Sequence, residues 1–266
     1  MGSGCSCSHK AAEGIKDGRP TATATILSKA MFPSEGRSVE DQVTLLKTFK
    51  DQHQVQMHKK ISELCVTVQT ELPAGVNTLR LNTMKMKDKD WQHFTYCLGF
   101  CPQLIRLHLW KVTISRASLD LLASYILGMP KLQYLTLGDM DLNSFPLGCL
   151  AEALKNLYEL KELVLTVNYM DSAHFAMLVP GIEVLDQLEV LSLDENELGD
   201  AGAQIVVQLL VKLLRLRSLS LKFNSIRHKG FAQLLSAQRQ YRSVKLHMEG
   251  NDLTDDEFEE LELAQT

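Results

Sequence analysis

The chain has 266 residues, of which 45% are hydrophobic and 23% are charged, and its formal net charge is −4. This hydrophobic content is ordinary for a soluble protein, and no apolar run approaches the ~18 residues that a membrane-spanning helix needs. The mildly negative charge argues against bulk binding of nucleic acid. The first residues lack a secretory hydrophobic segment, so we expect no secretory leader.

The N-terminus carries a lipidation-type pattern. Gly2 and Ser6 fit the N-myristoylation pattern M-G-x-x-x-[ST]. A single myristoyl chain binds membranes with K on the order of 10⁴ M⁻¹, so stable anchoring needs a second signal. Basic residues downstream are too dispersed to supply it, and we therefore predict palmitate on Cys5 or Cys7. The alternative is a chance match, or a vector-derived Met-Gly-Ser.

The next segments predict a tether and a cap. Residues 1–37 are mostly small and polar, which indicates a flexible tether. Residues 38–75 are predicted to form an N-terminal cap, with a helix over 38–60 whose start is marked by Ser38 and Asp41. We expect a short strand, around Leu64 to Val68, to join this cap to the main sheet.

Residues 76–253 repeat a hydrophobic pattern every 28 positions, which indicates about seven stacked copies of one structural unit. A strand-like alternation opens each unit, and apolar residues at helical spacing follow it. The seventh copy comes one residue early, with Ser243, Leu246 and Met248. The three hydrophobic series are Val76, Leu104, Leu132, Leu160, Leu188 and Leu216; Leu79, Leu107, Leu135, Leu163, Leu191 and Leu219; and Leu81, Leu109, Leu137, Leu165, Leu193 and Leu221.

The pattern L-x-x-L-x-L-x-x resembles the leucine-rich repeat, in its ribonuclease-inhibitor-like class. The resemblance implies an α/β solenoid, with parallel strands on a concave face and helices on a convex face. It also implies that an asparagine at the ninth position of a unit hydrogen-bonds the turning backbone. Four units have it, as Asn168, Asn196, Asn224 and Asn251.

Two departures from the repeat are informative. The first three units carry Met84, Val112 and Met140 at the ninth position, so we expect them to turn differently, with a looser or shorter convex segment. Pro180 falls within the fourth unit's helix and removes a backbone donor, so we expect a break or kink near Val179.

Charge is segregated at the C-terminal end. No acid occurs from Val211 to Met248, whereas the only charges from Glu249 to Glu262 are acidic. A capping helix is predicted over 254–266, with Thr254 and Glu257 as a capping box and Phe258 and Leu261 facing inward. The basic stretch is a candidate docking face for an acidic peptide, an anionic lipid face or phosphate, or else the acidic helix neutralises it, chiefly at Arg215, Arg239 and Arg242. Its candidate binding residues are Arg217, Lys222, Phe223 and Lys245.

A second candidate surface lies on the first concave strands. His108, Trp110 and Tyr134 occupy outward positions there, with Arg80 nearby. Aromatic residues and arginine carry much of the binding energy at protein interfaces. The alternative is that Trp110 packs sideways against Tyr134 within the sheet. The acidic residues Asp139, Asp194 and Glu195 occur on later units.

No motif for catalysis or cofactor binding is present, so we predict no enzymatic activity, no cofactor and no metal site. His93, Cys97 and Cys101 have metal-like spacing, but the repeat places both cysteines in the core. Cys65, Cys97, Cys101 and Cys149 fall on predicted strand or helix positions, and we expect reduced thiols.

The sequence favours a non-enzymatic protein-binding scaffold or adaptor, monomeric alone and tethered by N-terminal acylation to the cytosolic face of a plasma or ciliary membrane. One alternative is a structural component of a cytoskeletal or ciliary assembly, in the cytoplasm. Another is a GTPase-activating protein resembling the Ran type, which uses the same repeat class. The pattern does not identify the partner.

Overall fold

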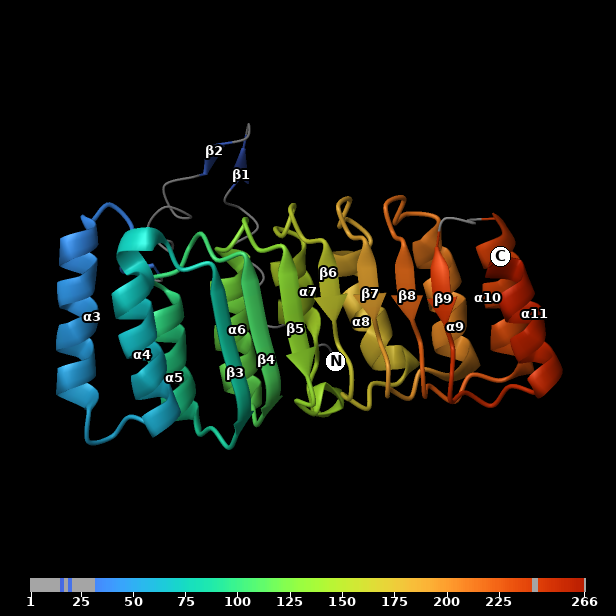
Figure 1. Cartoon of the computed structure of the whole chain (residues 1–266), viewed down its shortest axis with the longest axis horizontal. Coiled ribbons are helices and arrows are strands. Elements are labelled where there is room, and N and C mark those ends of the chain that lie inside the picture. The colour runs from blue at the N-terminus through green and yellow to red at the C-terminus, as the bar shows by residue number, and fades with distance from the viewer. Residues whose placement is uncertain (1–14, 17–18, 21–31, 241–243, 266) are drawn as a thin grey trace.

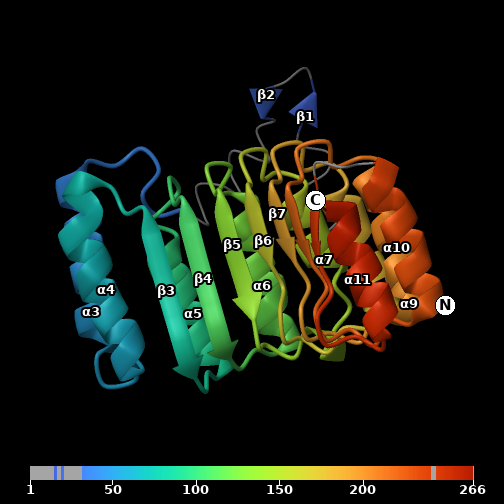
Figure 2. The ribbon, with the colours of Figure 1, turned by 45° about the vertical axis from the view of Figure 1, so that its right-hand side comes forward.

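The computed structural model describes residues 15–16, 19–20, 32–240 and 244–265. Within them, seven parallel strands form one sheet in sequence order, from β3 to β9. The strands line one face of an elongated body and the helices line the other, with α3 and α11 at opposite ends (Figures 1 and 2). The predicted α/β solenoid is confirmed. None of the described helices is long and apolar enough to cross a membrane.

The strands of this sheet are β3 (Thr78–Met84), β4 (Arg106–Val112), β5 (Tyr134–Gly138), β6 (Glu162–Val164), β7 (Val190–Ser192), β8 (Ser218–Ser220) and β9 (Lys245–His247). The helices are α3 (Val39–His53), α4 (Lys59–Glu71), α5 (Asp88–Leu98), α6 (Arg116–Leu127), α7 (Gly148–Leu154), α8 (Ser172–Ile182), α9 (Gly199–Leu210), α10 (His228–Gln240) and α11 (Asp255–Gln265). Two short 3₁₀ helices, η2 (Leu72–Ala74) and η3 (Leu142–Ser144), join them. A separate two-stranded hairpin pairs β1 (Ile15–Lys16) with β2 (Arg19–Pro20).

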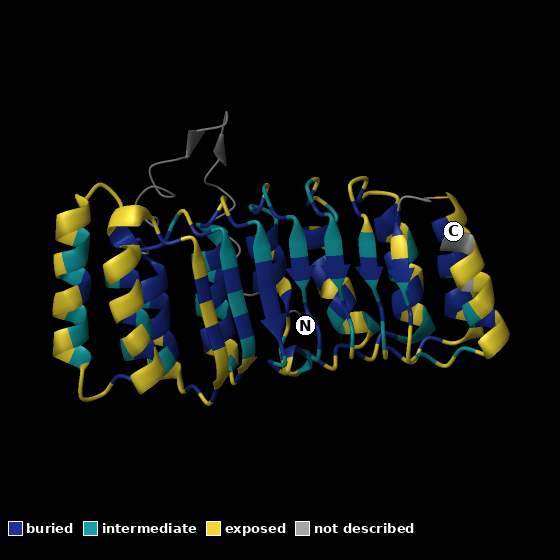
Figure 3. Ribbon diagram, viewed as in Figure 1, coloured by how far each residue is buried: buried dark blue, intermediate teal, exposed yellow. Residues whose placement is uncertain are grey.

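Strand register follows the repeat directly. Leu79 pairs with Leu107, and Leu107 pairs with Leu135, so each strand is shifted from its neighbour by one full repeat. The last step, from Leu219 to Leu246, is one position shorter, as the early seventh copy predicts. Successive side chains of a strand point to opposite faces, so the leucines are buried between sheet and helices while alternate residues face the concave surface (Figure 3).

One residue of each unit, next to last in β3 and β4 and beyond the end of the later strands, adopts a left-handed conformation, with φ between 49° and 56° in six consecutive units. This backbone region is uncommon for residues other than glycine. In the last unit Gly250 occupies it, with φ of 74°. The six residues are Thr83, Lys111, Asp139, Val167, Glu195 and Phe223.

The repeat asparagines hold these turns together as predicted. The Asn196 side-chain oxygen accepts the Met170 N–H at 3.0 Å, and its amide donates to the carbonyl oxygens of Leu165 and Leu193 at 3.1 and 2.8 Å. Asn168, Asn224 and Asn251 make equivalent bonds to their own and the preceding unit. These amides therefore pair backbone groups that would otherwise be buried without a partner.

The early units do turn differently, but not as we expected. Their helices α5 and α6 have 11 and 12 residues, so the prediction of a shorter convex segment is wrong there, and only α7, with 7 residues, is short. The difference lies in the strands, since β3 and β4 have seven residues each, β5 has five and the later ones have three. With buried Met84 and Val112 in place of asparagine, the backbone continues its pairing with the neighbouring strand.

Helix α8 runs unbroken through Pro180 to Ile182, so the predicted break near Val179 is wrong. The Glu183 N–H donates to the Val179 carbonyl at 2.9 Å across the proline. Pro180 lies in the last turn, where only one backbone donor is lost. Gly181 permits the close packing there, because a Cβ on it would lie 2.3 Å from the Ala151 carbonyl oxygen of α7.

The N-terminal cap is a pair of helices. Ser38 begins α3 as predicted, with its hydroxyl accepting the Asp41 N–H at 3.1 Å. The strand predicted around Leu64 to Val68 is wrong, because this segment belongs to α4. Ile61, Cys65 and Val68 are buried on one helical face, and this spacing outweighs the apparent alternation of the segment.

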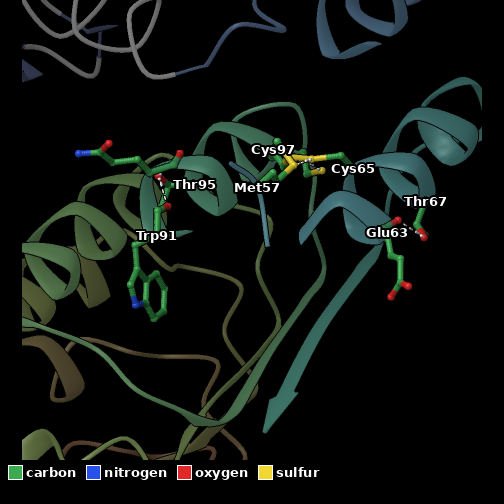
Figure 4. The surroundings of a disulfide bond; sticks show 9 residues. Met57, Glu63, Cys65, Thr67, Trp91, Thr95 and Cys97 are labelled. Atoms are coloured by element: carbon green, nitrogen blue, oxygen red, sulfur yellow. Dashed lines mark hydrogen bonds between the residues drawn. A yellow bond between two sulfur atoms is a disulfide. The ribbon is translucent and has the colours of Figure 1, made fainter. Parts of the chain in front are cut away.

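A disulfide joins the cap to the first repeat. Cys65 of α4 and Cys97 of α5 are bonded, with their Cα atoms 6.0 Å apart (Figure 4), a separation that a disulfide spans. Cys149 is also disulfide-bonded. The expectation of reduced thiols is therefore wrong for these three residues. Cys101 is a buried thiol whose pKa burial raises to about 12.

The segment assigned to the tether reaches the folded body at Phe32. Its ring is buried against Gly128 and contacts the Tyr125 ring edge-on, with centroids 5.8 Å apart. The Ser34 hydroxyl donates to the Gly99 carbonyl at 3.1 Å. Residues 32–34 thus lie against the C-terminal ends of α5 and α6.

Candidate protein interface on the concave face

The register of the first three strands places six outward side chains in a compact array. Arg80 pairs with His108, and Trp110 pairs with Asn82 on one side and Gly138 on the other. Arg106 pairs with Tyr134. Neighbouring strands lie about 4.8 Å apart and alternate residues of one strand about 6.6 Å apart, so these side chains are within reach of one another.

Two stacked pairs organise this array. The Arg106 guanidinium lies 3.7 Å from the centroid of the Tyr134 ring. The rings of His108 and Trp110 are nearly parallel, with centroids 6.4 Å apart. We define the concave cluster as Arg80, Arg106, His108, Trp110 and Tyr134.

Trp110 does not pack against Tyr134, which was the alternative to an interface role. Its ring covers Gly138, where an added Cβ would lie 2.3 Å from the indole. Trp110 and Tyr134 are both half-buried. The alternative packing is therefore wrong, and the binding role of both residues stays a prediction.

The concave cluster holds positive charge without a matching acid. Lys111 forms an ion pair with Asp139 at 3.5 Å, but among the described residues no acid lies within ion-pair distance of Arg80 or Arg106. Burial lowers the pKa of His108, and the charges of Arg80 and Arg106 lower it further.

The C-terminal basic face is different, because acids of the last segment reach much of it. Lys222 pairs with Glu249 at 3.4 Å, Arg227 with Asp252 at 3.5 Å, and Arg239 with Glu260 at 2.7 Å. Neutralisation, the alternative to docking, thus holds for these three cations. Arg242 lies outside the described residues.

Other parts of the basic face remain exposed. Arg217 and Lys245 are exposed, and Arg215 is as well; within the described ranges none of them has an ion-pair partner. Phe223 is 56% exposed, and its ring lies over Gly250 of the next unit. Lys222 therefore differs from Arg217 and Lys245, because it already forms an ion pair within the described structure.

The closing helix α11 begins as predicted. The Thr254 N–H donates to the Glu257 carboxylate at 2.8 Å, and the Glu257 N–H donates to the Thr254 hydroxyl at 3.3 Å. Glu257 also contacts His228 of α10. The Thr254 N–H and His228 lower the pKa of Glu257. Phe258 is half-buried, and the Leu261 side chain lies outside the described part of the structure.

Two of the acidic residues predicted on the concave side, Asp194 and Asp139, make contacts within the fold. The Asp194 carboxylate accepts the Lys222 N–H at 2.9 Å and the Ser192 hydroxyl at 3.3 Å. Asp139 pairs with Lys111. Glu195, by contrast, is exposed on its turn.

Sequence reasoning missed Arg106. Its position one repeat before Tyr134 gives the strand pairing that brings the two residues together, so the repeat itself contained the signal. Lys60 of α4 was also missed; its ammonium donates to the carbonyl oxygens of Asn82 and Thr83 at 2.9 and 3.0 Å, at the edge of the array.

The predicted metal-like array does not form a site in the described structure. Cys97 is bonded to Cys65, and Cys101 is buried in the core. No group of three His, Cys, Asp or Glu side chains there could hold a metal ion. The predicted lipidation residues Gly2, Cys5 and Cys7 lie outside the described residues.

Two solved structures are similar to this chain at low sequence identity. An internalin, InlF, from Listeria monocytogenes is 18% identical, with a TM-score of 0.45 over 86% of this chain and 66% of its own. The leucine-rich-repeat ectodomain of the Arabidopsis receptor kinase HAESA, solved with an extended IDA peptide hormone, is 17% identical, with a TM-score of 0.35 over 67% of this chain and 29% of its own.

The chain thus spans less than two thirds of either protein. No family model and no curated protein matches the sequence. The regular strand register, the buried leucines and the asparagine bonds decide the assignment. The fold is a leucine-rich-repeat solenoid.

Proposed function

We propose that this chain is a non-enzymatic scaffold that binds a protein partner on the concave cluster of β3, β4 and β5. The observation that carries the proposal is the half-buried set of stacked aromatic and cationic side chains, with Arg106 on Tyr134 and Trp110 beside His108. Aromatic residues and arginine in partly desolvated settings supply most of the binding energy at protein interfaces.

The sheet makes this cluster rigid before any partner arrives. Trp110 is held over Gly138 by packing, and Tyr134 is covered on one face by Arg106. Side chains that are already ordered lose little conformational freedom on binding, which favours affinity. The rest of the concave surface has smaller side chains, such as Val164, Ser192 and Ser220, so a protruding segment of a partner can approach the sheet there.

Site-specific photo-crosslinking tests the proposal. A photo-reactive residue at Asn82, beside the concave cluster, should crosslink to a distinct partner in cells, and one at Ser236 on α10 should not. Replacing Trp110 and Tyr134 together by Ala should then abolish the crosslink from Asn82. The proposal fails if the double variant crosslinks as the parent does, or if Ser236 yields the same partner.

We further propose that acylation at Gly2, with palmitate on Cys5 or Cys7, tethers the scaffold to the cytosolic face of a membrane. The support is the N-terminal pattern and the need for two membrane signals. The Gly2→Ala substitution should shift the protein from the membrane fraction to the cytosolic fraction. Replacing Cys5 and Cys7 by Ser should leave only weak, reversible association with membranes. Membrane pelleting of Gly2→Ala at the parent level would contradict this.

A further inference from the structure

We propose that Arg80, Arg106 and His108 bind the carboxylates of an acidic, extended segment of the partner protein. This inference rests on the proposed interface and names the chemistry that it recognises. It depends on three observations, which concern the convergence of the three side chains, their lack of counter-charges and the orientation of one guanidinium.

Strand pairing brings the three cationic or basic side chains together. Arg80 and His108 are direct register partners on β3 and β4. Arg106 lies two residues before His108, on the same face of β4. Paired residues on adjacent strands lie about 4.8 Å apart. One or two carboxylates of a bound segment can therefore contact Arg80, Arg106 and His108 together.

Arg80 and Arg106 lack a counter-charge, unlike two other cations of the concave side, although Glu162 of β6 is the register partner of Tyr134. Lys111 is paired with Asp139 and Lys222 with Glu249, but Arg80 and Arg106 have no ion pair and their guanidinium groups donate no hydrogen bond within the described structure. Like charges held close together repel, and an anion placed among them is stabilised.

Arg106 is oriented for a carboxylate. Its guanidinium carbon, Cζ, lies over the Tyr134 ring, 3.7 Å from the ring centroid. The N–H groups of a guanidinium lie in its plane, so stacking leaves the fork of donors free to make a two-point contact with a carboxylate. The neighbouring Tyr134 and Trp110 rings also reduce water around this contact, which strengthens it.

The shape and charge of the chain argue against two other occupants. A concave surface cannot contact a flat bilayer along its floor, which disfavours an anionic membrane. The chain's own acids at 249–260 lie at the opposite end of the solenoid (Figure 1), where Glu249, Asp252 and Glu260 already pair with basic residues. The occupant that we propose for the concave cluster is therefore an acidic segment of a separate protein.

The test uses the full chain and two synthetic peptides of equal length, one alternating Glu with Ala and Gly, the other with Gln in place of each Glu. Tryptophan emission reports on the site, because Trp110 is half-buried in it and the second tryptophan, Trp91, is fully buried on the other side of the sheet. The Glu peptide should change the emission saturably, and the Gln peptide should not.

Charge neutralisation with a matched control locates the binding. Arg80→Gln with Arg106→Gln should weaken binding of the Glu peptide by about tenfold or more, because one exposed and one half-buried charge contact are removed together. Arg116→Gln with Lys47→Gln removes the same charge from exposed positions on α6 and α3, away from both candidate faces, and should leave binding within about twofold. Thermal melts of both variants establish that each is folded.

A titration gives an independent readout. The groups facing His108 are Arg80 on β3, Arg106 on β4 and Tyr134 on β5, with Lys60 of α4 at the edge. Because bound carboxylates favour the protonated imidazole, the NMR pKa of His108 should rise when the Glu peptide is added. Affinity should therefore increase as pH falls toward the pKa of free His108, and His108→Gln should remove this dependence.

Several outcomes would overturn the inference. These are equal binding of the Gln peptide, equal loss of binding in the Arg116 and Lys47 control, an unchanged His108 pKa, or binding to phosphatidylserine vesicles in place of the peptide. The proposed function fails separately. If the crosslinked partner is retained when Arg80 and Arg106 are neutralised but lost with Trp110 and Tyr134, the interface stands and its acidic specificity is wrong.

Discussion

The first three units and the last four use the same repeat frame in different ways. In β3 and β4 an apolar residue takes the ninth position and the strand runs for seven residues, which extends the pairing as far as Trp110 and Gly138. In β6 to β9 an asparagine takes that position, and the strands have three residues. The longer strands therefore provide the platform that carries the concave cluster.

The two regions also differ in part in how their cations are paired, although Arg217 and Lys245 of the last units form no ion pair in the described structure and Lys111 of the first units does. In the last units, Lys222, Arg227 and Arg239 are paired with acids from the closing segment. In the first units, Arg80 and Arg106 are without such partners in the described structure. The two units with the longest strands, β3 and β4, both have an apolar residue at the ninth position, and the third unit, with Met140 there, has a strand of five residues.

The greatest loss of stability should be common to both halves, because the leucine core is continuous. Leu109→Ala in the first half and Leu193→Ala in the second should each lower the free energy of unfolding by about 2–5 kcal/mol, since both are fully buried. Urea denaturation measures this, with exposed Lys245→Ala as a control below roughly 0.5 kcal/mol. If Lys245→Ala costs as much as Leu193→Ala, the inward and outward positions are assigned wrongly.

A somewhat smaller loss concerns the first half alone. The Cys65–Cys97 bond has a sequence separation of 32 residues, and losing a disulfide that closes a loop of this order costs about 2–4 kcal/mol. Cys65→Ala should therefore increase amide hydrogen exchange in α3 and α4, and α11 should serve as the unaffected reference. Unchanged exchange in both helices would show that the bond is not needed for the cap.

The asparagine bonds distinguish the second half. Asn196→Leu should cost about 2–3 kcal/mol, because the Met170 N–H and the Leu165 carbonyl lose a partner at about 1–3 kcal/mol per buried group. The matched change in the first half, Met84→Leu, should cost less than about 1.5 kcal/mol since it exchanges similar apolar volumes. Equal losses in urea melts would mean that the ninth position plays the same part in both halves.

The mildest change is expected at the closing helix. Thr254→Ala should cost about 1 kcal/mol, as the loss of an N-cap hydroxyl usually does. The pKa of Glu257 is lowered in the folded state, so its stabilising effect is present above the unfolded pKa and is lost as pH falls through the folded pKa. Helix α11 should fray on acidification in the parent, as followed by amide exchange, and a pH-independent helix would contradict this assignment.

Much of the fold could be predicted, because one pattern is repeated many times. The leucine series determined the register, and Ser38 and Thr254 marked two helix starts. The segment from Leu64 to Val68 could not be predicted, since so short a run fits a strand and a helix alike and only packing against the first repeat decides. The pairing of Cys65 with Cys97 likewise depends on how α4 meets α5.

The site was predictable to a smaller extent. The strand alternation placed His108, Trp110 and Tyr134 on the concave face correctly. It could not show that Lys222 meets Glu249, because that contact depends on the shortened last unit. Nor could it show that the Trp110 ring covers Gly138. Strand alternation gives the face of the sheet to which Trp110 points, but not the neighbouring strand over which its ring lies.

The attachment of Phe32 determines where a mechanical force would enter the molecule. Its ring is seated against Gly128 and Tyr125, and Ser34 is bonded to Gly99, so a pull on the chain ahead of Phe32 enters the body at α5 and α6. The pair α3 and α4 follows in sequence and is joined to the same place, by the Gln42 amide that donates to the Ser34 carbonyl and by the Cys65–Cys97 disulfide. A scaffold held by its N-terminus would therefore take up tension at α5 and α6 first, and not at the end of the solenoid.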